Sequence, residues 1–352
     1  MPEVKRVTMT HGAGGAVMAR LIEEYVLPYL GGFKTEVGLE MLDDAAVVDD
    51  VVFKSDSHVV RPVFFPGGDI GRLAVAGTVN DLAVLGAEPV ALACGFVLEE
   101  GLAFNDLKQV LTSMKATCEE AEVFVVTGDT KVVERGNLGG LVVNMSGIGK
   151  WNRALDDNLA VVKKYRRDFD ARWVLDRNLR TGDKIILSGT IGDHGLAVLS
   201  AQEGLAFGSK IVSDVKPLNH MIRNVLEVGG VVSMKDPTRG GLANALNEWS
   251  QKARVGILVQ EDKIPIRNGV KVACEMLGID PLEVGNEGKV IIGVVKEMAR
   301  EVLEVLRHSK EGKNAEIIGE ASGEFDLVAL ETVVGGRRIL PMPIGDPVPR
   351  IC

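Results

Sequence analysis

Cysteine is scarce in this chain, and its spacing excludes two common scaffolds. The 352 residues include four cysteines, at positions 94, 118, 274 and 352. No two of them form a C-x-x-C pair, so the sequence supports neither a zinc ribbon nor a disulfide framework. His11, His58 and His194 are scattered. They make no metal-ligand spacing and no nucleophile–histidine arrangement.

Other absences narrow the class of protein. No G-x-x-x-x-G-K-[ST] run occurs, which excludes a Walker-type nucleotide site. The opening residues, MPEVKRVTMTHGAGG, lack the apolar core of a signal peptide, so we expect a cytoplasmic protein. Positive charge is in deficit, because 40 Lys and Arg against 49 Asp and Glu give a net charge of -9. That balance argues against binding to nucleic acid or to an anionic membrane.

The longest apolar stretch, residues 73–98, is long enough to cross a bilayer. Polar residues and a proline interrupt its middle, where charge is costly and proline breaks a helix. They are Asn80, Asp81, Glu88 and Pro89. The stretch therefore predicts a buried helix, a turn and a buried strand over Val90–Val97.

Helical and strand patterns alternate along the chain, which predicts an α/β fold with mixed sheets. We expect helices over 16–30, 104–121, 240–251, 268–277 and 298–307, and one running toward Ser200. We expect strands over 90–97, 123–127, 140–148, 184–188, 255–259 and 289–295, and two within 45–63. The strand over Val123–Thr127 is predicted to be buried and to end at Gly128.

These patterns divide the chain into two domains, 1–150 and 181–334. The intervening segment, 151–180, holds eight Lys or Arg, five Asp and two tryptophans. Mixed charge of this kind favours a solvated, partly helical surface. A docking surface with Trp151 or Trp173 as its anchor is the alternative.

The last segment, 335–352, carries four prolines between Pro341 and Pro349. Such spacing favours a flexible, extended chain with few hydrogen bonds. At about 3.1 Å per residue, the twelve residues from Pro341 would reach roughly 37 Å. Cys352 at its end is then either an accidental last residue or a mobile thiol that accepts a group as a nucleophile.

Aspartates at the breaks of apolar segments are the clearest candidates for chemistry. There are five in the first half, Asp43, Asp44, Asp56, Asp81 and Asp129. Any one of them can simply cap a helix or form a turn. Together they suit Mg²⁺, which carboxylates hold jointly with substrate phosphates. Lys131 is either a matching phosphate contact or a surface lysine.

The second half offers a possible anion site and one more carboxylate. Asp236 precedes a predicted helix start, and Thr238 and Arg239 there can donate to an anion. Glu287, between Asn286 and Gly288, is either a turn residue or a ligand.

Several motifs together resemble the HypE family of hydrogenase maturation proteins. Its superfamily includes aminoimidazole ribonucleotide synthetase, selenophosphate synthetase and thiamine-monophosphate kinase. The matching motifs are HGAGG (11–15), LDDAAV (42–47), FFPGGDIGRLAVAGTVNDLAVLGAEP (64–89), VTGDTKVV (126–133), SGTIGDHG (188–195), MKDPTRGGLANALNE (234–248), NEGK (286–289) and PRIC (349–352). The PRIC ending singles out the HypE family within the superfamily.

The resemblance implies two α/β domains with ATP and Mg²⁺ in the cleft between them, and a homodimer formed through the N-terminal sheet. It assigns the five aspartates of the first half to the nucleotide and the metal. Asp236, Thr238 and Arg239 would complete the nucleotide site. Lys131, Glu287 and Cys352 would be catalytic, with the identity of the base left open.

The implied activity is a dehydration. In the family, the carbamoyltransferase HypF loads a carbamoyl group onto the terminal cysteine. ATP-dependent dehydration then gives a thiocyanate, whose cyano group passes to iron held by HypC–HypD for [NiFe] hydrogenase. The tail would therefore need two positions, inward to react and outward to be loaded and unloaded. Two rivals remain: a kinase or cyclo-ligase acting on a small molecule, and a passive carrier of a modified cysteine.

Overall fold

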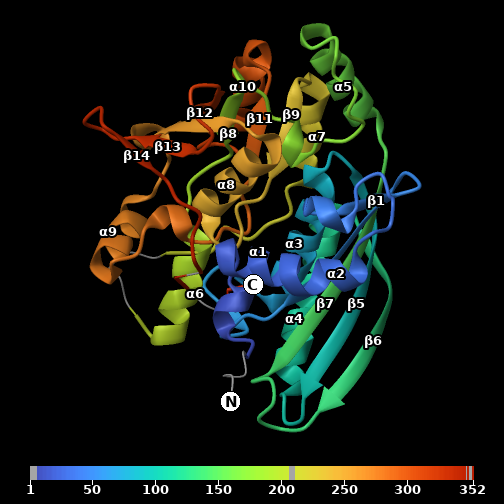
Figure 1. Ribbon diagram of the computed structural model, residues 1–352. Coiled ribbons are helices and arrows are strands. Elements are labelled where there is room, and N and C mark those ends of the chain that lie inside the picture. Colours follow the sequence, from blue (N-terminus) through green and yellow to red (C-terminus); the bar gives the residue numbers. More distant parts are fainter. Residues whose placement is uncertain (1–5, 206–210, 346, 349–350) are drawn as a thin grey trace, which may run out of the picture.

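Two β-sheets with flanking helices make up the computed structural model (Figure 1), which describes residues 6–205, 211–345, 347–348 and 351–352. In this part of the chain, one sheet has five strands in the order β1-β2-β7-β5-β6 and the other has seven, β14-β13-β10-β12-β8-β11-β9. Each contains both parallel and antiparallel pairs. The predicted α/β class with mixed sheets is confirmed.

The N-terminal sheet carries its helices on one face. Its strands are β1 (Ala46–Val48), β2 (Val51–His58), β5 (Glu88–Glu99), β6 (Phe124–Val133) and β7 (Leu141–Lys150), with a hairpin of β3 (Phe64–Phe65) and β4 (Gly68–Asp69) beside them. Helices α3 (Ile70–Val84) and α4 (Phe104–Ala121) pack against it, as Figure 1 shows. The Asp69 carboxylate caps α3 by accepting the Gly71 and Arg72 amides at 2.8 and 3.0 Å.

The apolar stretch of residues 73–98 forms α3 and β5, as its interrupting polar residues predicted. All of α3 except Arg72 is buried, because the helix lies against the sheet on one side and the C-terminal half on the other. Within the described residues, no helix is long and apolar enough to cross a membrane.

Strand β6 differs from its prediction. It runs from Phe124 to Val133, past the predicted end at Gly128, and none of its residues is buried. It pairs with β5 on one side only and forms the edge of the sheet. An apolar run at an uncovered edge has the same sequence pattern as a buried strand, which explains the error.

The C-terminal half surrounds the seven-stranded sheet. Its strands are β8 (Lys184–Leu187), β9 (Val231–Lys235), β10 (Gly256–Gln260), β11 (Ile291–Val294), β12 (Glu316–Ser322), β13 (Val328–Glu331) and β14 (Arg337–Ile339). Its helices are α6 (Asp193–Glu203), α7 (Asn219–Val228), α8 (Gly241–Ala253), α9 (Asn268–Leu277) and α10 (Ala299–His308). The predicted helices and strands are all present, whereas the sequence patterns missed α7, β9 and β12–β14.

The charged segment 151–180 packs onto this half. Its helix α5 (Arg153–Tyr165) lies against α7 and buries Leu155, Leu159 and Val162. Trp173 is only 1% exposed, so the alternative in which it anchors a partner is wrong. Trp151 packs edge-on against it, with ring centroids 4.9 Å apart.

The terminal segment folds back toward the N-terminal half. Part of it, β14, belongs to the sheet, so the chain leaves the sheet later than residue 335. The Ala16 amide then donates to the Pro343 carbonyl at 3.0 Å. Val348 and Ile351 are buried, and the C-terminus lies close to α1 (Gly15–Leu21) and α6 (Figure 1). Pro349 and Arg350 of the terminal motif lie outside the described residues.

Helix α1 continues through a π-helical turn (Ile22–Val26) into α2 (Leu27–Leu30), which confirms the predicted helix over 16–30.

Candidate active site

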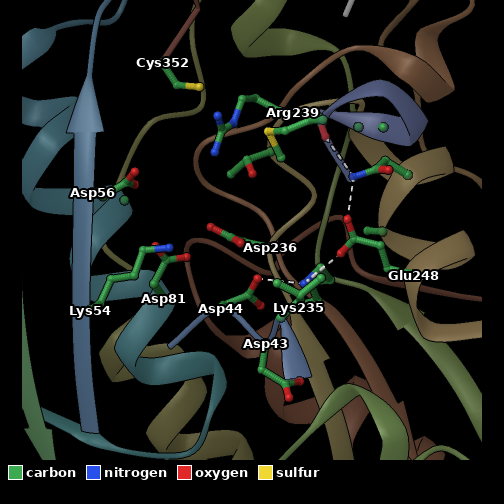
Figure 2. A pocket seen from close by; sticks show the side chains of 18 of the residues that line it. Asp43, Asp44, Lys54, Asp56, Asp81, Lys235, Asp236, Arg239, Glu248 and Cys352 are labelled. Carbon is green, nitrogen blue, oxygen red and sulfur yellow. Dashed lines mark hydrogen bonds and ion pairs between the residues drawn. The ribbon is translucent and has the colours of Figure 1, made fainter. Parts of the chain in front are cut away.

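A cavity of about 260 Å³ lies between the two halves and gathers most of the predicted site residues (Figure 2). Those that line it are Asp43, Asp44, Asp56, Asp81, Asp236, Thr238, Arg239, Glu287 and Cys352. They come from elements far apart in the sequence, so the fold assembles the cavity from both halves.

Element ends place these side chains. Asp44 lies just before β1, and Asp56 is on β2. Asp81 projects from the last turn of α3. Asp236 follows β9 directly, and Arg239 lies immediately before the N-terminal turn of α8. Strands and helices that end at a shared opening bring polar side chains together there, which is the usual geometry of α/β binding sites.

Three of the carboxylates form a compact group. Asp44, Asp81 and Asp236 each offer one oxygen, and these oxygens lie within 4.8 Å of one another. Burial, reinforced by Asp56 and Asp44, raises the pKa of Asp81 to about 7. Burial and the nearby Asp81 raise the pKa of Asp236 well above its usual range. Buried oxygen ligands that lie this close together fit a hard divalent cation such as Mg²⁺.

Asp43 does not belong to this group. Its carboxylate accepts the Asp176 amide at 3.1 Å. Burial and the Asp176 charge raise the pKa of Asp43 to about 6. In Figure 2 it lies beyond Asp44, at the end of the cavity away from Cys352. Asp43 therefore supports the loop that carries Asp44.

Two lysines in the cavity were missed by sequence reasoning. Lys54 lies 2.8 Å from the Asp81 carboxylate. Lys235 lies 2.7 Å from Asp44 and 3.1 Å from Glu248. A signal for Lys54 existed, because residues two apart on a strand share a face and Lys54 precedes Asp56 by two. For Lys235 the sequence held no signal beyond its place next to Asp236.

A buried ion-pair network supports this side of the cavity. Asp176, from the segment 151–180, lies 2.6 Å from Lys252 and 3.3 Å from Lys235. Its other carboxylate oxygen accepts the Trp249 indole N–H at 2.8 Å. The network ties that segment to α8 and holds the ammonium of Lys235 against Asp44.

Glu287 is almost fully buried and faces the same cavity. Its Oε1 has no hydrogen-bond partner among the described residues. Burial, followed by the charge of Asp236, raises the pKa of Glu287 well above its usual range. An unpartnered buried carboxyl in a cavity is poised to exchange a proton with a bound molecule.

Cys352 lines the cavity at the end opposite Asp43, near Arg239 (Figure 2). It is partly buried, whereas the other three cysteines are buried. The charge of Cys352 is the main cause that raises the pKa of Arg239, against the effect of burial. Cys352 and Arg239 also line a second cavity of about 560 Å³, so the cysteine lies where the two cavities meet.

Asp129 and Lys131 lie elsewhere. They form an ion pair of 3.0 Å on the edge strand β6, where their side chains are 69% and 70% exposed. Neither lines the cavity of its own chain.

The two α/β halves match the two domains of one class of proteins, the AIR synthase related proteins. The AIR synthase related N-terminal domain family matches residues 42–151, and the corresponding C-terminal domain family matches residues 180–330. Within that class the chain belongs to the HypE family. It is 42% identical to the carbamoyl dehydratase HypE of Bradyrhizobium diazoefficiens, over 98% of this chain and 96% of that protein.

Two solved structures of HypE are similar to this chain over most of its length. HypE in a HypE–HypF complex superimposes with a TM-score of 0.83 at 41% identity, covering 92% of this chain and 99% of that one. Hydrogenase maturation protein HypE in complex with ATP gives a TM-score of 0.78 at 39% identity, covering 99% of this chain and 100% of that one.

Proposed function

We propose that this protein is an ATP-dependent carbamoyl dehydratase that acts on a carbamoyl group carried by its own Cys352. The product is a thiocyanate, which supplies the cyanide ligand in [NiFe] hydrogenase maturation. One observation carries the proposal: the terminal cysteine lines the same cavity as the buried carboxylates. The relatives called carbamoyl dehydratase HypE and the HypE structure in complex with ATP support it.

The reaction needs ATP because an amide oxygen is a poor leaving group. Transfer of the γ-phosphoryl group to that oxygen lets it depart as phosphate. The amide nitrogen loses two protons, the C–O bond breaks and a C≡N bond forms. The products are the S-cyano cysteine, ADP, phosphate and a proton.

Asp44, Asp81 and Asp236 would hold Mg²⁺, since they form the compact oxygen group of the cavity. The ion would offset negative charge on the phosphates during transfer. Arg239 and Thr238, just before α8, would bind phosphate oxygens, and Asp43 and Asp56 would complete the nucleotide site.

The residue that removes the amide protons must reach the carbamoyl group. Glu287 meets that condition, because it lies in the cavity with an unpartnered oxygen, and its raised pKa makes the ionised carboxylate a stronger base. Lys131 of the same chain lies outside the cavity. We therefore favour Glu287 as the base.

A homodimer would give Asp129 and Lys131 a role. The edge strand β6 exposes Phe124, Val126 and Val132. Edges of this kind invite pairing with a second sheet. We propose that two copies, each with domains 1–150 and 181–334, pair through their N-terminal sheets and that Asp129 and Lys131 reach the partner's cavity. HypF, as in the HypE–HypF complex, and HypC–HypD would be transient partners of the tail.

The decisive experiment is intact mass of the C-terminal peptide. The full chain is incubated with HypF and carbamoyl phosphate, and the peptide is analysed before and after the addition of Mg²⁺-ATP. A gain of one carbamoyl group followed by loss of one water is expected. Stable carbamoylation with no later loss of water would reject the dehydratase.

Replacing Cys352 by alanine tests the small-molecule rival. If the protein were a kinase or cyclo-ligase, C352A would consume ATP with the small-molecule substrate as fast as the wild type does. ATP consumed only by the carbamoylated wild type would eliminate both that rival and the passive carrier.

A further inference from the structure

We propose that His194 is the positioning residue that holds the C-terminal tail inward, through a hydrogen bond from its Nε2 to the backbone carbonyl of Ile351. This inference deepens the proposed function, because it assigns a latch to the segment that presents Cys352. His194 is the second residue of α6, in the SGTIGDHG motif, and it lines neither cavity at Cys352. No role was assigned to it from the sequence.

The contact itself is short and buried. His194 Nε2 lies 2.7 Å from the Ile351 oxygen, and both residues are almost completely buried. A carbonyl oxygen only accepts, so Nε2 must carry the hydrogen. The residue bonded in this way immediately precedes Cys352. The bond therefore fixes the tail one residue before its reactive thiol.

The contact at the other ring nitrogen agrees with this tautomer. His194 Nδ1 lies 2.8 Å from the Ser213 hydroxyl, which accepts the Val215 amide at 3.1 Å. Because the Ile351 carbonyl requires the hydrogen on Nε2, Nδ1 of the neutral ring has only a lone pair, and the Ser213 hydroxyl donates to it while accepting from the Val215 amide. Nδ1 is then the acceptor, and the hydrogen stays on Nε2. Burial lowers the pKa of His194, which favours this neutral form.

Packing keeps the ring at this angle. Phe65, from the N-terminal half, meets the imidazole edge-on at a centroid distance of 5.4 Å and an interplanar angle of 90°. Ile351 fits against Gly285 so closely that a Cβ there would lie 2.5 Å from Ile351 Cδ1. The imidazole and the close contact of Ile351 with Gly285 together define one inward position of the tail.

A latch of this kind suits a tail that must also leave. A single side-chain hydrogen bond to backbone holds any residue type at position 351 and breaks without covalent change. The Pro343 carbonyl, bonded to Ala16 at 3.0 Å, marks a separate contact nearer the sheet. Release at His194 would free the last residues first.

Two isosteric variants isolate the Nε2 bond. H194Q places an amide where Nε2 lies, so it can still donate to Ile351. H194N places its amide where Nδ1 lies, so it keeps the Ser213 contact and loses the hydrogen bond to the Ile351 carbonyl. H220A is the matched control, because His220 contacts a backbone carbonyl, that of Glu120 at 3.2 Å, on the surface of α7.

The measurement is the rate at which a maleimide carrying a polyethylene glycol chain labels Cys352, since the other three cysteines are buried. Loss of one buried hydrogen bond predicts about tenfold faster labelling of H194N, with H194Q within about threefold of wild type. H220A should label like wild type. Equal rates for H194N and H194Q, or no change in either, would overturn the latch.

A measurement on the unsubstituted protein covers the case in which the variants misfold. The ¹⁵N spectrum of the histidines should show His194 as the Nε2–H tautomer, and its signals should shift when Cys352 is labelled. An Nδ1–H tautomer would overturn the proposal. Neither readout involves dehydration, so the latch and the proposed function can fail separately.

Discussion

The ammonium group of Lys54 lies 2.8 Å from the Asp81 carboxylate, inside the carboxylate cavity. Lys54 thus neutralises one member of the group Asp44, Asp81 and Asp236 from within the protein. Asp236 has no such lysine partner among the described residues, and burial raises its pKa strongly. The cavity therefore retains an excess of negative charge for a divalent cation to offset.

Asp81→Asn should remove Mg²⁺ binding while the fold persists. The substitution takes away one of three charged ligands and leaves the ammonium of Lys54 facing a neutral amide. We expect Mg²⁺ affinity to fall by about a hundredfold or more, as measured by calorimetry with a non-hydrolysable ATP analogue. Asp168→Asn is the control, because Asp168 pairs with Arg180 at 2.8 Å on the surface. Equal Mg²⁺ affinity in D81N and D168N would place the metal elsewhere.

Magnesium affinity should also depend on pH near neutrality. The pKa of Asp81 is raised to about 7, chiefly by burial, so this carboxyl is largely protonated at pH 6. A protonated carboxyl does not bind the ion, and affinity therefore rises as pH increases through 7. One displaced proton predicts about tenfold tighter binding at pH 8 than at pH 6. Calorimetry in buffers of different ionisation enthalpy would detect the released proton; its absence would contradict the shift.

Local patterns were enough to predict the aspartates but not their counterions. Asp44, Asp81 and Asp236 each lie at a visible break in an apolar run, where side chains reach a cleft. Lys235 pairs with Asp44 across 191 residues of sequence. No local pattern encodes a contact of that kind, because only the packing of the two halves brings Asp44, just before β1, against Lys235 at the end of β9.

The prediction that β6 is buried was wrong, and the prediction of a solvated surface over 151–180 was incomplete, for a related reason. Alternation and apolarity describe a strand, but they do not tell whether another layer covers it, so β6 was predicted to be buried. Charge in 151–180 predicted a solvated surface. The same segment also contributes Asp176, which is buried because Lys252 and Trp249 supply partners from α8.

Asp176→Asn should destabilise the protein strongly. The amide would keep an acceptor for Trp249 and would place an N–H₂ group against the ammonium groups of Lys235 and Lys252. Breaking a buried ion pair on one side costs about 3–5 kcal/mol. Urea denaturation should show that loss, whereas the surface variant D168N should stay within about 1 kcal/mol of wild type. A small effect in D176N would mean that the two lysines find other partners.

Because Asp129 and Lys131 lie away from the cavity of their own chain, we predict that each active site of the dimer combines residues of both chains. If each cavity uses Asp81 of its own chain and Asp129 of the partner, homodimers of D81N and of D129N should both be inactive. A mixed dimer behaves differently. One of its cavities combines both substitutions, and the other has both native carboxylates.

Mixing the two variants after mild dissociation should therefore restore activity in one of the two cavities of each mixed dimer. Random pairing yields mixed dimers as about half of the population, so recovery should approach one quarter of wild-type dehydration. The loss of water from carbamoylated Cys352 is the readout, followed by mass spectrometry. Phe124→Asp on the exposed face of β6 serves as the control, because it should prevent pairing and abolish the recovery. Recovery that persists with F124D would disprove pairing through this sheet. No recovery from dimers shown to be mixed would mean that Asp129 does not act across the dimer.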